Sequence, residues 1–348
     1  MSNPMSNPMK SIRVELGTRG YDVLVGHGVC TELAAMLPKS ARRAAVVTQS
    51  GIGVSVDTAL PTEVFEIGIG EEHKTLQTIE RLCDGFAEMG ITRNDVIIGV
   101  GGGMVTDVAG FAAASWHRGI PVVHVSTTLL GMIDAAIGGK TGVNLRSGKN
   151  LVGAFWQPSG VICDLDALAT LPPREMRCGY GEMAKYHFLT GDDLLAMDLV
   201  DRVATCIQIK ADIVASDERE GGRRALLNYG HTLAHALEID SNFALAHGEA
   251  VAVGLIYAAH LAEVLGRIDS RRVDDHYRVV GGLYQLDTAL PQSDPERLLG
   301  LMGRDKKALD SLTFVLDSER GVELVSGVDP EAVREALATM AGHGPWQQ

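Results

Sequence analysis

The first half of the chain alternates short apolar runs with amphipathic segments. Residues 11–25 alternate between apolar and polar side chains, which predicts two paired strands at the start of the fold. Four further runs are mostly apolar and short enough to be buried strands: residues 44–48, 95–100, 122–125 and 160–163. Residues 75–89 are amphipathic, and the segment that follows the run at residues 95–100 is apolar as far as Ala114. Helices are therefore expected between the strands. Strands that alternate with helices predict an α/β layer built on a parallel sheet.

After Pro172 the pattern changes to long helical periods. The helices expected there cover residues 174–189, 194–216, 218–239 and 248–265, and a terminal helix begins at Pro330. The change predicts two domains, residues 1–172 and residues 173–348, of which the second is helical. A chain of 348 residues is long enough for two, since single cores rarely grow beyond about 250–300 residues.

One of the expected helices carries a polar stripe. Five polar side chains recur at spacings of 4, 3, 4 and 3 residues: Arg224, Asn228, His231, His235 and Glu238. In a helix this rhythm places all five on one face, where a soluble helix normally carries its apolar stripe. Burying such a face is costly unless a charged group or a metal ion meets it. The segment predicts an active-site helix, and His247, 12 residues after His235, is expected to return to the same place.

The amino-acid composition of the chain limits the kinds of molecule that it is expected to bind. The formal net charge of −13 argues against nucleic acid or an anionic membrane surface, but a small anionic substrate stays open because its binding depends on local lysines and arginines. The five cysteines form no C-x-x-C pair, which favours reduced thiols in a cytoplasmic protein. The first residues lack the apolar core of a signal peptide, and no stretch offers the ~18 charge-free apolar residues of a membrane span.

Three segments at the ends of expected strands are candidates for ligand binding. Gly101, Gly102 and Gly103 follow a strand and open a helix, where glycine backbone can approach a pyrophosphate and free N–H groups can bind it. The dinucleotide fingerprint G-x-G-x-x-G is absent, so a purely structural turn is an equal interpretation. Residues 70–74 and 126–128 also border strands, and the strand ends of an open α/β sheet face the ligand crevice.

Residues 134–150 form a glycine-rich segment that carries Lys140, Lys149 and Asn150. Its composition resembles a phosphate-binding loop, but the P-loop spacing is absent, which excludes a nucleotide triphosphatase. A mobile surface loop is the alternative interpretation.

A catalytic zinc site needs three protein ligands and an open position. Glu182, His231 and His247 would supply one carboxylate and two imidazoles; alternatively, His231 and His235, four residues apart, could both be ligands. The H-E-x-x-H motif is absent. Glu182 precedes Lys185 by three residues, a spacing that also suits a surface ion pair.

Together these segments resemble the 3-dehydroquinate synthases of the sugar phosphate cyclase superfamily, over about residues 65–310. The most specific matches are residues 101–111, 127–155, 171–175 and 226–238. The resemblance implies a Rossmann-like α/β domain that binds NAD, an all-α C-terminal domain that holds zinc or cobalt, and a homodimer.

The resemblance also implies roles for individual residues. The metal ligands would be Glu182, His231 and His247, which leaves His235 on the substrate side. The positions that match NAD-binding residues are Gly70, Glu71, Glu72, His73, Lys74, Gly103, Met104, Val105, Thr106, Asp107, Thr127, Thr128, Lys140, Lys149, Ala167, Leu168, Ala169 and Thr170. The positions that match groups around the substrate phosphate are Lys140, Asn150, Asn228, His235, Lys306 (or Lys307) and Arg118, the last reaching across the dimer. Lys210 and Arg224 match the pair that holds the substrate carboxylate, while Asp134, Lys185 and Glu220 match positions that contact hydroxyl groups.

The implied substrate is a small sugar phosphate, 3-deoxy-D-arabino-heptulosonate 7-phosphate, converted to 3-dehydroquinate and phosphate in the shikimate pathway of aromatic amino acid biosynthesis. Transient oxidation by NAD would acidify a C–H bond, phosphate would leave by β-elimination, and hydride return, ring opening and an aldol step would close the carbocycle. The alternatives are an amino-dehydroquinate synthase of a secondary-metabolite pathway and a metal-dependent polyol or glycerol-phosphate dehydrogenase of related fold. A valiolone-type cyclase has no substrate carboxylate, and Lys210 with Arg224 argues against it.

The chain departs from the family pattern at three places. Residues 48–65 are shorter than the usual strand-helix-strand, so one helix is expected to be missing or minimal. Residues 191–199 are also short, and Thr106 stands where many members carry glycine. The two short segments are compatible with a subfamily that uses a different substrate.

Overall fold

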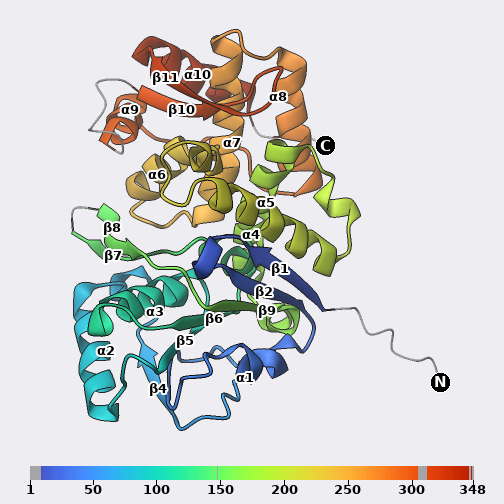
Figure 1. Cartoon of the computed structure of the whole chain (residues 1–348). Helices are drawn as coiled ribbons and strands as arrows, with labels where there is room; N and C mark the ends of the chain where they lie inside the picture. Colours follow the sequence, from blue (N-terminus) through green and yellow to red (C-terminus); the bar gives the residue numbers. More distant parts are fainter. Residues whose placement is uncertain (1–8, 147, 305–311, 345, 347–348) are drawn as a thin grey trace, which may run out of the picture. The chain divides into compact units, whose positions relative to one another are not determined.

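The structure is a computed structural model that describes residues 9–146, 148–304, 312–344 and 346 (Figure 1). The chain divides into two compact units, which we call unit 1 (Met1–Met176 with Asp198–Arg219) and unit 2 (Arg177–Met197 with Glu220–Gln348). The expected boundary at residue 172 is close to the first division. The sequence pattern did not indicate that the helix after Asp198 returns to unit 1.

Unit 1 is built on a seven-stranded sheet of order β1-β2-β9-β6-β5-β3-β4. Its strands are β1 (Lys10–Val14), β2 (Tyr21–Gly26), β3 (Ala44–Gln49), β4 (Thr62–Ile67), β5 (Val96–Gly101), β6 (Val122–Ser126) and β9 (Gly160–Asp164). Its helices are α1 (Leu33–Met36), α2 (Leu76–Met89), α3 (Gly103–Ser115) and α5 (Leu199–Ser216). Neighbouring strands pair in parallel except for β1 and β2, which pair antiparallel. The parallel sheet and the strands expected from apolar runs are therefore confirmed.

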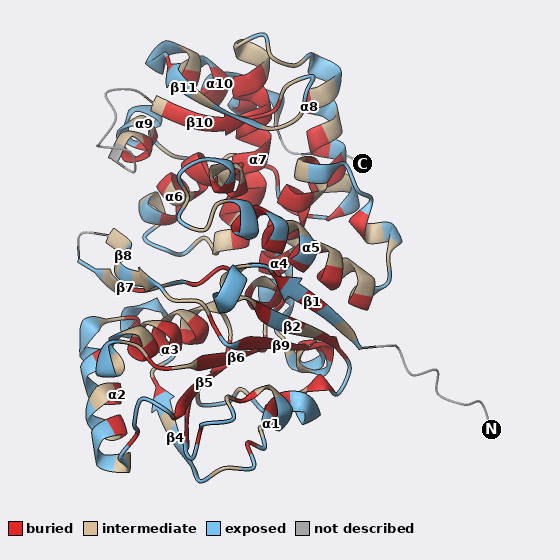
Figure 2. Ribbon diagram, viewed as in Figure 1, coloured by how far each residue is buried: buried red, intermediate tan, exposed pale blue. Residues whose placement is uncertain are grey.

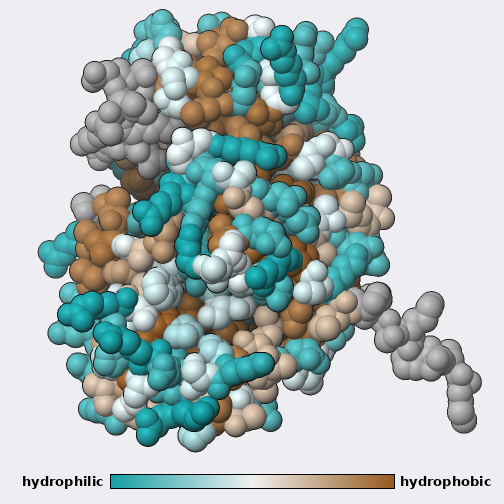
Figure 3. Space-filling model, viewed as in Figure 1, coloured by the Kyte–Doolittle hydropathy of each residue, from teal (hydrophilic) through white to brown (hydrophobic). Residues whose placement is uncertain are grey.

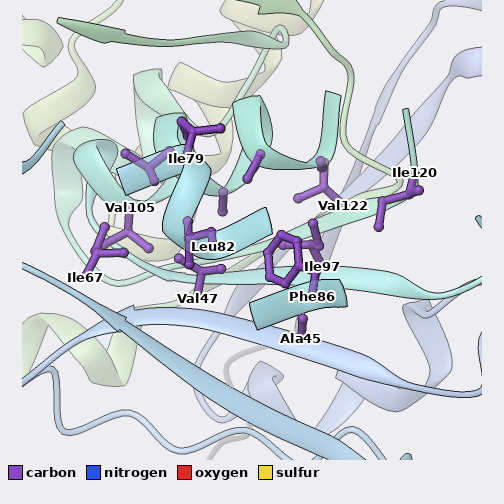
Figure 4. Packing of buried hydrophobic residues seen from close by; sticks show 14 of the residues in the cluster. Ala45, Val47, Ile67, Ile79, Leu82, Phe86, Ile97, Val105, Ile120 and Val122 are labelled. Carbon is purple, nitrogen blue, oxygen red and sulfur yellow. The ribbon is translucent and has the colours of Figure 1, made fainter. Parts of the chain in front are cut away.

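The centre of the sheet is covered on both faces. All residues of β5, β6 and β9 are buried, which is typical of parallel strands with helices on each side (Figure 2). On one face the amphipathic helix α2 packs Ile79, Leu82 and Phe86 against the strand residues Val47 and Ile97 (Figure 4). These contacts explain why the apolar residues of α2 recur with a helical period while the central strands are mostly apolar.

The strand β4 was not expected from the apolar pattern. It lies at the edge of the sheet, and four of its six residues are exposed, so it has no apolar run to detect. Residues 50–61, between β3 and β4, contain no helix, which confirms the shortened connection expected after Thr48.

The glycine-rich segment 134–150 is largely ordered rather than a loop. Its first two residues end a π-helical turn (Gly131–Ala135), and the rest enters an antiparallel hairpin of β7 (Lys140–Leu145) and β8 (Gly148–Phe155). Glycine is needed because a Cβ atom on Gly142 would lie 2.8 Å from the carbonyl oxygen of Val152. The large exposed hydrophobic residues of the hairpin are Leu145, Leu151 and Phe155, and Figure 3 shows hydrophobic atoms over it.

Unit 2 is mainly helical, as expected. Its helices are α4 (Pro173–Thr190, from Arg177 onward in this unit), α6 (His231–Asp240), α7 (His247–Val264), α8 (Ser270–Tyr277), α9 (Pro295–Arg304) and α10 (Pro330–His343). A two-stranded antiparallel sheet of β10 (Leu312–Leu316) and β11 (Glu323–Val328) was not indicated by the sequence pattern. Across the described ranges, no helix combines the length and apolar character needed to cross a membrane.

The continuous helix expected over residues 218–239 is wrong. Residues Arg223–Asn228 form a 3-10 segment, and α6 begins only at His231. Between them Gly230 has a φ of 79°, a left-handed conformation that glycine adopts without a Cβ penalty. Arg224 and Asn228 therefore do not share a helix face with His231. A smaller difference concerns residues 194–216, where α5 begins at Leu199 after the capping side chain of Asp198.

Candidate metal and cofactor sites

The NAD-binding candidates of unit 1 follow the carboxyl ends of its parallel strands. Residues 70–74 come after β4, residues 103–107 after β5, Thr127 and Thr128 after β6, and residues 167–170 after β9. Because the strands are parallel, their carboxyl ends lie along the same side of the sheet. The segments that follow them therefore leave the sheet on that side, where ligands of open α/β folds bind. The sheet thus brings together segments that are far apart in the sequence.

Lys74 is the centre of a polar network on this side of the sheet. Its side chain is buried, and Nζ donates to Oδ2 of Asp107 at 2.6 Å and to Oδ1 of Asn150 at 2.6 Å. The backbone N–H of Asn150 donates to Oδ1 of Asn144 at 3.0 Å, and Nδ2 of Asn144 donates to Oε2 of Glu71 at 2.7 Å, so the network extends to Glu71. Asn144 was not singled out in the sequence, because nothing in its local pattern shows that the hairpin would return to residues 71–74.

The glycine turn before α3 allows close backbone approach. A Cβ atom on Gly102 would lie 2.8 Å from Cγ2 of Thr128, and one on Gly103 would lie 3.0 Å from Cβ of Ala135. The first turn of α3 also accommodates the unusual Thr106, whose hydroxyl donates to the carbonyl of Gly103 at 3.0 Å. A helix N-terminus that follows a glycine turn is a common binding place for a pyrophosphate, since its dipole favours negative charge.

The buried Lys210 and the half-buried Asp134 form a second ion pair in unit 1. Nζ of Lys210, on α5, donates to Oδ1 of Asp134 at 2.6 Å and to its carbonyl oxygen at 2.7 Å. Both residues were expected at the substrate, Lys210 toward a carboxylate and Asp134 toward a hydroxyl. Arg224, the expected partner of Lys210, lies in unit 2 and is also buried.

Several other candidates occupy more open positions. Lys140 begins β7 and is exposed, Lys149 on β8 is half-buried, and Arg118 is exposed in the 3-10 turn that follows α3. Lys306 and Lys307 lie outside the residues that the structure describes.

Glu182, His231 and His247 converge in unit 2. Their ligand atoms all lie within 4.8 Å of one another. Nε2 of His231 and Nε2 of His247 are each 3.1 Å from Oε1 of Glu182, although the three residues come from α4, α6 and α7. One carboxylate and two imidazoles that converge in this way fit a catalytic zinc site with an open position.

Each imidazole of this cluster is held at its other nitrogen. Nδ1 of His231 donates to the carbonyl oxygen of Tyr229 at 3.0 Å, and Nδ1 of His247 is 3.2 Å from Oε2 of Glu238. A proton on Nδ1 leaves the Nε2 lone pair free to bind a metal ion. Glu238 was found in the sequence as a member of the polar stripe, but its role as a partner of His247 follows only from the structure.

The cluster is centred on the buried carboxylate of Glu182, whose negative charge attracts the positive charges around it. Burial raises the pKa of Glu182, but Lys185 and His231 outweigh burial and hold that pKa well below its usual range. Lys185 and Glu182 form a buried ion pair rather than a surface one. Burial lowers the pKa of His231, which keeps the imidazole in its neutral, ligating form. The pKa of His247 is raised to about 10 because its contacts with Glu182 and Glu238 outweigh burial.

A glycine adjoins each of the three candidate ligands, and this signal was missed in the sequence. Gly181 precedes Glu182, Gly230 precedes His231, and Gly248 follows His247. A Cβ atom on Gly181 would collide with the carbonyl oxygen of Gly248, and one on Gly254 would collide with that of Gly230. The backbones of α4 and α6 can therefore touch α7, and this contact brings the three side chains within reach of one metal ion.

The remaining described candidates in unit 2 include Asn228, Glu220 and His235. Asn228 donates from Nδ2 to Oε1 of Glu220 at 2.8 Å, so these two predicted substrate-side residues are joined. The ring of His235 lies 5.6 Å from that of His231 and 6.3 Å from that of His247, but His235 is not a member of the ligand cluster. The structure thus favours His247 over His235 as the third ligand.

The parallel sheet of unit 1 and the mainly helical unit 2 define a dehydroquinate synthase-like fold. The chain belongs to the 3-dehydroquinate synthase family: the family description 3-dehydroquinate synthase N-terminal matches residues 64–178, and 3-dehydroquinate synthase C-terminal matches residues 179–308. The expected fold and family are confirmed.

Two relatives illustrate the similarity of the chain to known proteins. The chain is 50% identical over 332 residues to a putative aminodehydroquinate synthase of Amycolatopsis mediterranei (strain S699), covering 95% of this chain and 94% of that protein. It is 40% identical over 362 residues to a 3-dehydroquinate synthase of Saccharopolyspora erythraea, covering 97% and 96% of the two chains.

Solved structures agree with the fold. A 2-deoxy-scyllo-inosose synthase complexed with carbaglucose-6-phosphate, NAD+ and Co2+ is similar with a TM-score of 0.83 and 27% identity, covering 96% of this chain and 100% of that one. A 2-epi-5-epi-valiolone synthase of Streptomyces hygroscopicus subsp. jinggangensis 5008 with NAD+ and Zn2+ bound has a TM-score of 0.82 and 27% identity, covering 93% and 97%.

Proposed function

We propose that this chain is an NAD- and metal-dependent cyclase of a carboxylated seven-carbon sugar phosphate, from which it eliminates phosphate. The observation that carries the metal dependence is the convergence of Glu182, His231 and His247 with both imidazoles held at Nδ1. Membership of the 3-dehydroquinate synthase family supports the reaction class. We also propose, as expected from the sequence, that the chain forms a homodimer and acts in the cytoplasm.

The residues of the chain fit both cofactors. The donor set of Glu182, His231 and His247 suits Zn2+ or Co2+, the ions held by the two structural neighbours. The strand ends around Lys74, Asp107 and the glycine turn suit the pyrophosphate and ribose groups of NAD. When bound, the metal supplies Lewis acidity at an alcohol oxygen, and NAD accepts a hydride and returns it.

The chain's own side chains position the substrate and neutralise its charge. Lys140, Asn150, Asn228 and His235 are proposed around the phosphate, with Arg118 supplied by a second copy. Arg224 can donate two parallel N–H groups to a carboxylate, and Lys210 adds a point charge that Asp134 orients. Positioning and charge stabilisation of this kind account for a large share of rate enhancement in such reactions.

A simple dehydrogenase is the alternative from another class. The structure of a protein described as a probable glycerol dehydrogenase of Sinorhizobium meliloti 1021 has a TM-score of 0.62 but only 20% identity, which supports a shared fold and no more. A dehydrogenase would consume NAD in proportion to product. The proposed cyclase returns its hydride in each cycle, so trace NAD should support many turnovers without accumulation of NADH.

A second candidate is the aminated counterpart of the same reaction, and one observation favours it. The match to the Amycolatopsis protein spans 332 positions, and 95% of the 348 residues is about 331, so that relative has almost no insertions relative to this chain. The match to the Saccharopolyspora enzyme spans 362 positions, more than the whole chain, so it must contain gaps. In the lengths of its segments the chain therefore resembles the aminodehydroquinate synthase relative more than the Saccharopolyspora enzyme.

One experiment separates these candidates. Purified protein with Zn2+ and trace NAD is given 3-deoxy-D-arabino-heptulosonate 7-phosphate, its amino analogue or sedoheptulose 7-phosphate, and phosphate release is measured. Preference for either carboxylated substrate supports the proposal, and the ratio of kcat/KM between them decides between hydroxyl and amine. Turnover of sedoheptulose 7-phosphate alone would refute it in favour of a valiolone-type cyclase.

A further inference from the structure

Tyr229 links a candidate metal ligand to a histidine outside the site. It lies in the turn between the 3-10 segment and α6, and its side chain is fully buried. Its backbone carbonyl accepts the Nδ1 hydrogen of His231 at 3.0 Å. Its hydroxyl oxygen is 2.7 Å from Nε2 of His276 on α8. One residue therefore contacts both histidines, through its backbone and through its phenol.

The direction of these hydrogen bonds is determined by their acceptors. Nδ1 of His276 lies 2.7 Å from the carbonyl oxygen of Arg272, which can only accept, so Nδ1 carries the proton. Nε2 is then the acceptor of the Tyr229 hydroxyl hydrogen. Burial lowers the pKa of His276 to about 4, which keeps the ring neutral, although Oδ2 of Asp317 lies 3.9 Å from Nε2. The same Oδ2 accepts from Nε of Arg272 at 2.7 Å.

Aromatic packing restricts the position of this pair. The ring of His276 stacks on that of Phe188, with centroids 4.0 Å apart and planes 4° apart. Phe188 belongs to α4, the helix that carries Glu182, and its ring meets Tyr229 edge-on at 6.2 Å. The phenol of Tyr229 is therefore held by a hydrogen bond and by a ring from the ligand-bearing helix.

We propose that His276 is a positioning residue for the metal site: it fixes the phenol of Tyr229, whose backbone carbonyl holds His231 with Nε2 toward the metal. The inference rests on the metal site of the proposed function. Outer partners of this kind fix the tautomer and orientation of a ligating imidazole, and their loss weakens metal binding.

The test compares two tyrosine variants of the full-length protein. Tyr229→Phe removes the hydroxyl and leaves the ring, and we expect the dissociation constant for Zn2+, measured by competition with a chromophoric chelator, to rise about tenfold. The absorption spectrum of the Co2+-loaded variant should change as well, because it reports ligand geometry. Tyr257→Phe is the matched control: Tyr257 is buried on α7, and its hydroxyl has no hydrogen-bond partner among the described residues.

A second pair tests His276 directly. His276→Phe keeps a ring over Phe188 but removes the acceptor, so it should weaken Zn2+ binding as Tyr229→Phe does. His276→Gln places an amide oxygen near the position of Nε2 and should restore most of the affinity. The inference is overturned if Tyr229→Phe and His276→Phe bind Zn2+ within about twofold of the parent, or if Tyr257→Phe loses as much affinity. A parent protein that binds no Zn2+ or Co2+ would overturn the proposed metal site itself, and this inference with it.

Discussion

Gly181 and Gly248 touch backbone to backbone, and each is the immediate neighbour of a candidate metal ligand. A Cβ atom on Gly181 would collide with the carbonyl oxygen of Gly248. Gly181→Ala should therefore push α4 away from α7 and separate Glu182 from His247, lowering both zinc content and thermal stability. Overpacking of this kind typically costs about 1–3 kcal/mol.

A glycine without neighbours provides the control for that variant. Gly300 lies on α9 and is exposed, and no described atom comes within 4 Å of a Cβ placed there. Gly300→Ala should leave zinc content unchanged and raise stability by about 0.5–1 kcal/mol, because alanine favours helices. Full zinc occupancy and an unchanged melting temperature in Gly181→Ala would show that the contact does not assemble the site.

His247 and His235 should respond differently to truncation. His247→Ala removes one member of the ligand cluster, so zinc per chain, measured by metal analysis, should fall well below one and activity should be lost. His235→Ala should retain its zinc, because its ring lies beside the cluster without belonging to it. Loss of zinc from His235→Ala, with retention in His247→Ala, would mean that the ligand set is assigned to the wrong histidine.

Lys74 should control binding of NAD rather than of metal. Lys74→Met leaves the carboxylate of Asp107 without its buried cation and frees Asn150, so the NAD concentration needed for half-maximal activity should rise at least tenfold. Zinc content should stay at the parental level, since Lys74 belongs to unit 1. Lys39→Met, at an exposed lysine of the same unit, is the control. An unchanged NAD requirement in Lys74→Met would remove this residue from the cofactor site.

Arg224 should decide the use of a carboxylated substrate. Removing one partner of a buried ion pair costs about 3–5 kcal/mol, which is roughly two to four decades in kcat/KM. Arg224→Ala should show such a loss on heptulosonate phosphate or its amino analogue and still bind zinc. The neighbouring Arg223 is exposed, so Arg223→Ala should retain parental turnover. Turnover by Arg224→Ala within about tenfold of the parent, well short of the expected loss, would contradict the carboxylate role and favour a valiolone-type cyclase.

The sequence by itself determined the elements whose pattern is local. Apolar runs predicted β3, β5, β6 and β9 because central parallel strands are buried on both faces, and amphipathic periodicity predicted α2. The residue types of Glu182, His231 and His247, together with the family resemblance, were enough to name the ligand cluster that the structure assembles. Residue chemistry and short-range spacing carry this information.

Only the tertiary structure decided the features that depend on contacts between distant segments. The edge strand β4 lacks an apolar run because most of it faces solvent, and α5 belongs to unit 1 through packing that its own sequence does not show. The polar stripe correctly indicated a site, but its five residues do not lie on one continuous helix. The chain turns at Gly230, and Gly230 contacts α7 there. Hydrophobic periodicity reports burial along one segment, whereas backbone contacts between glycines, and hydrogen bonds such as that of Tyr229 to His276, exist only once separate segments have packed together.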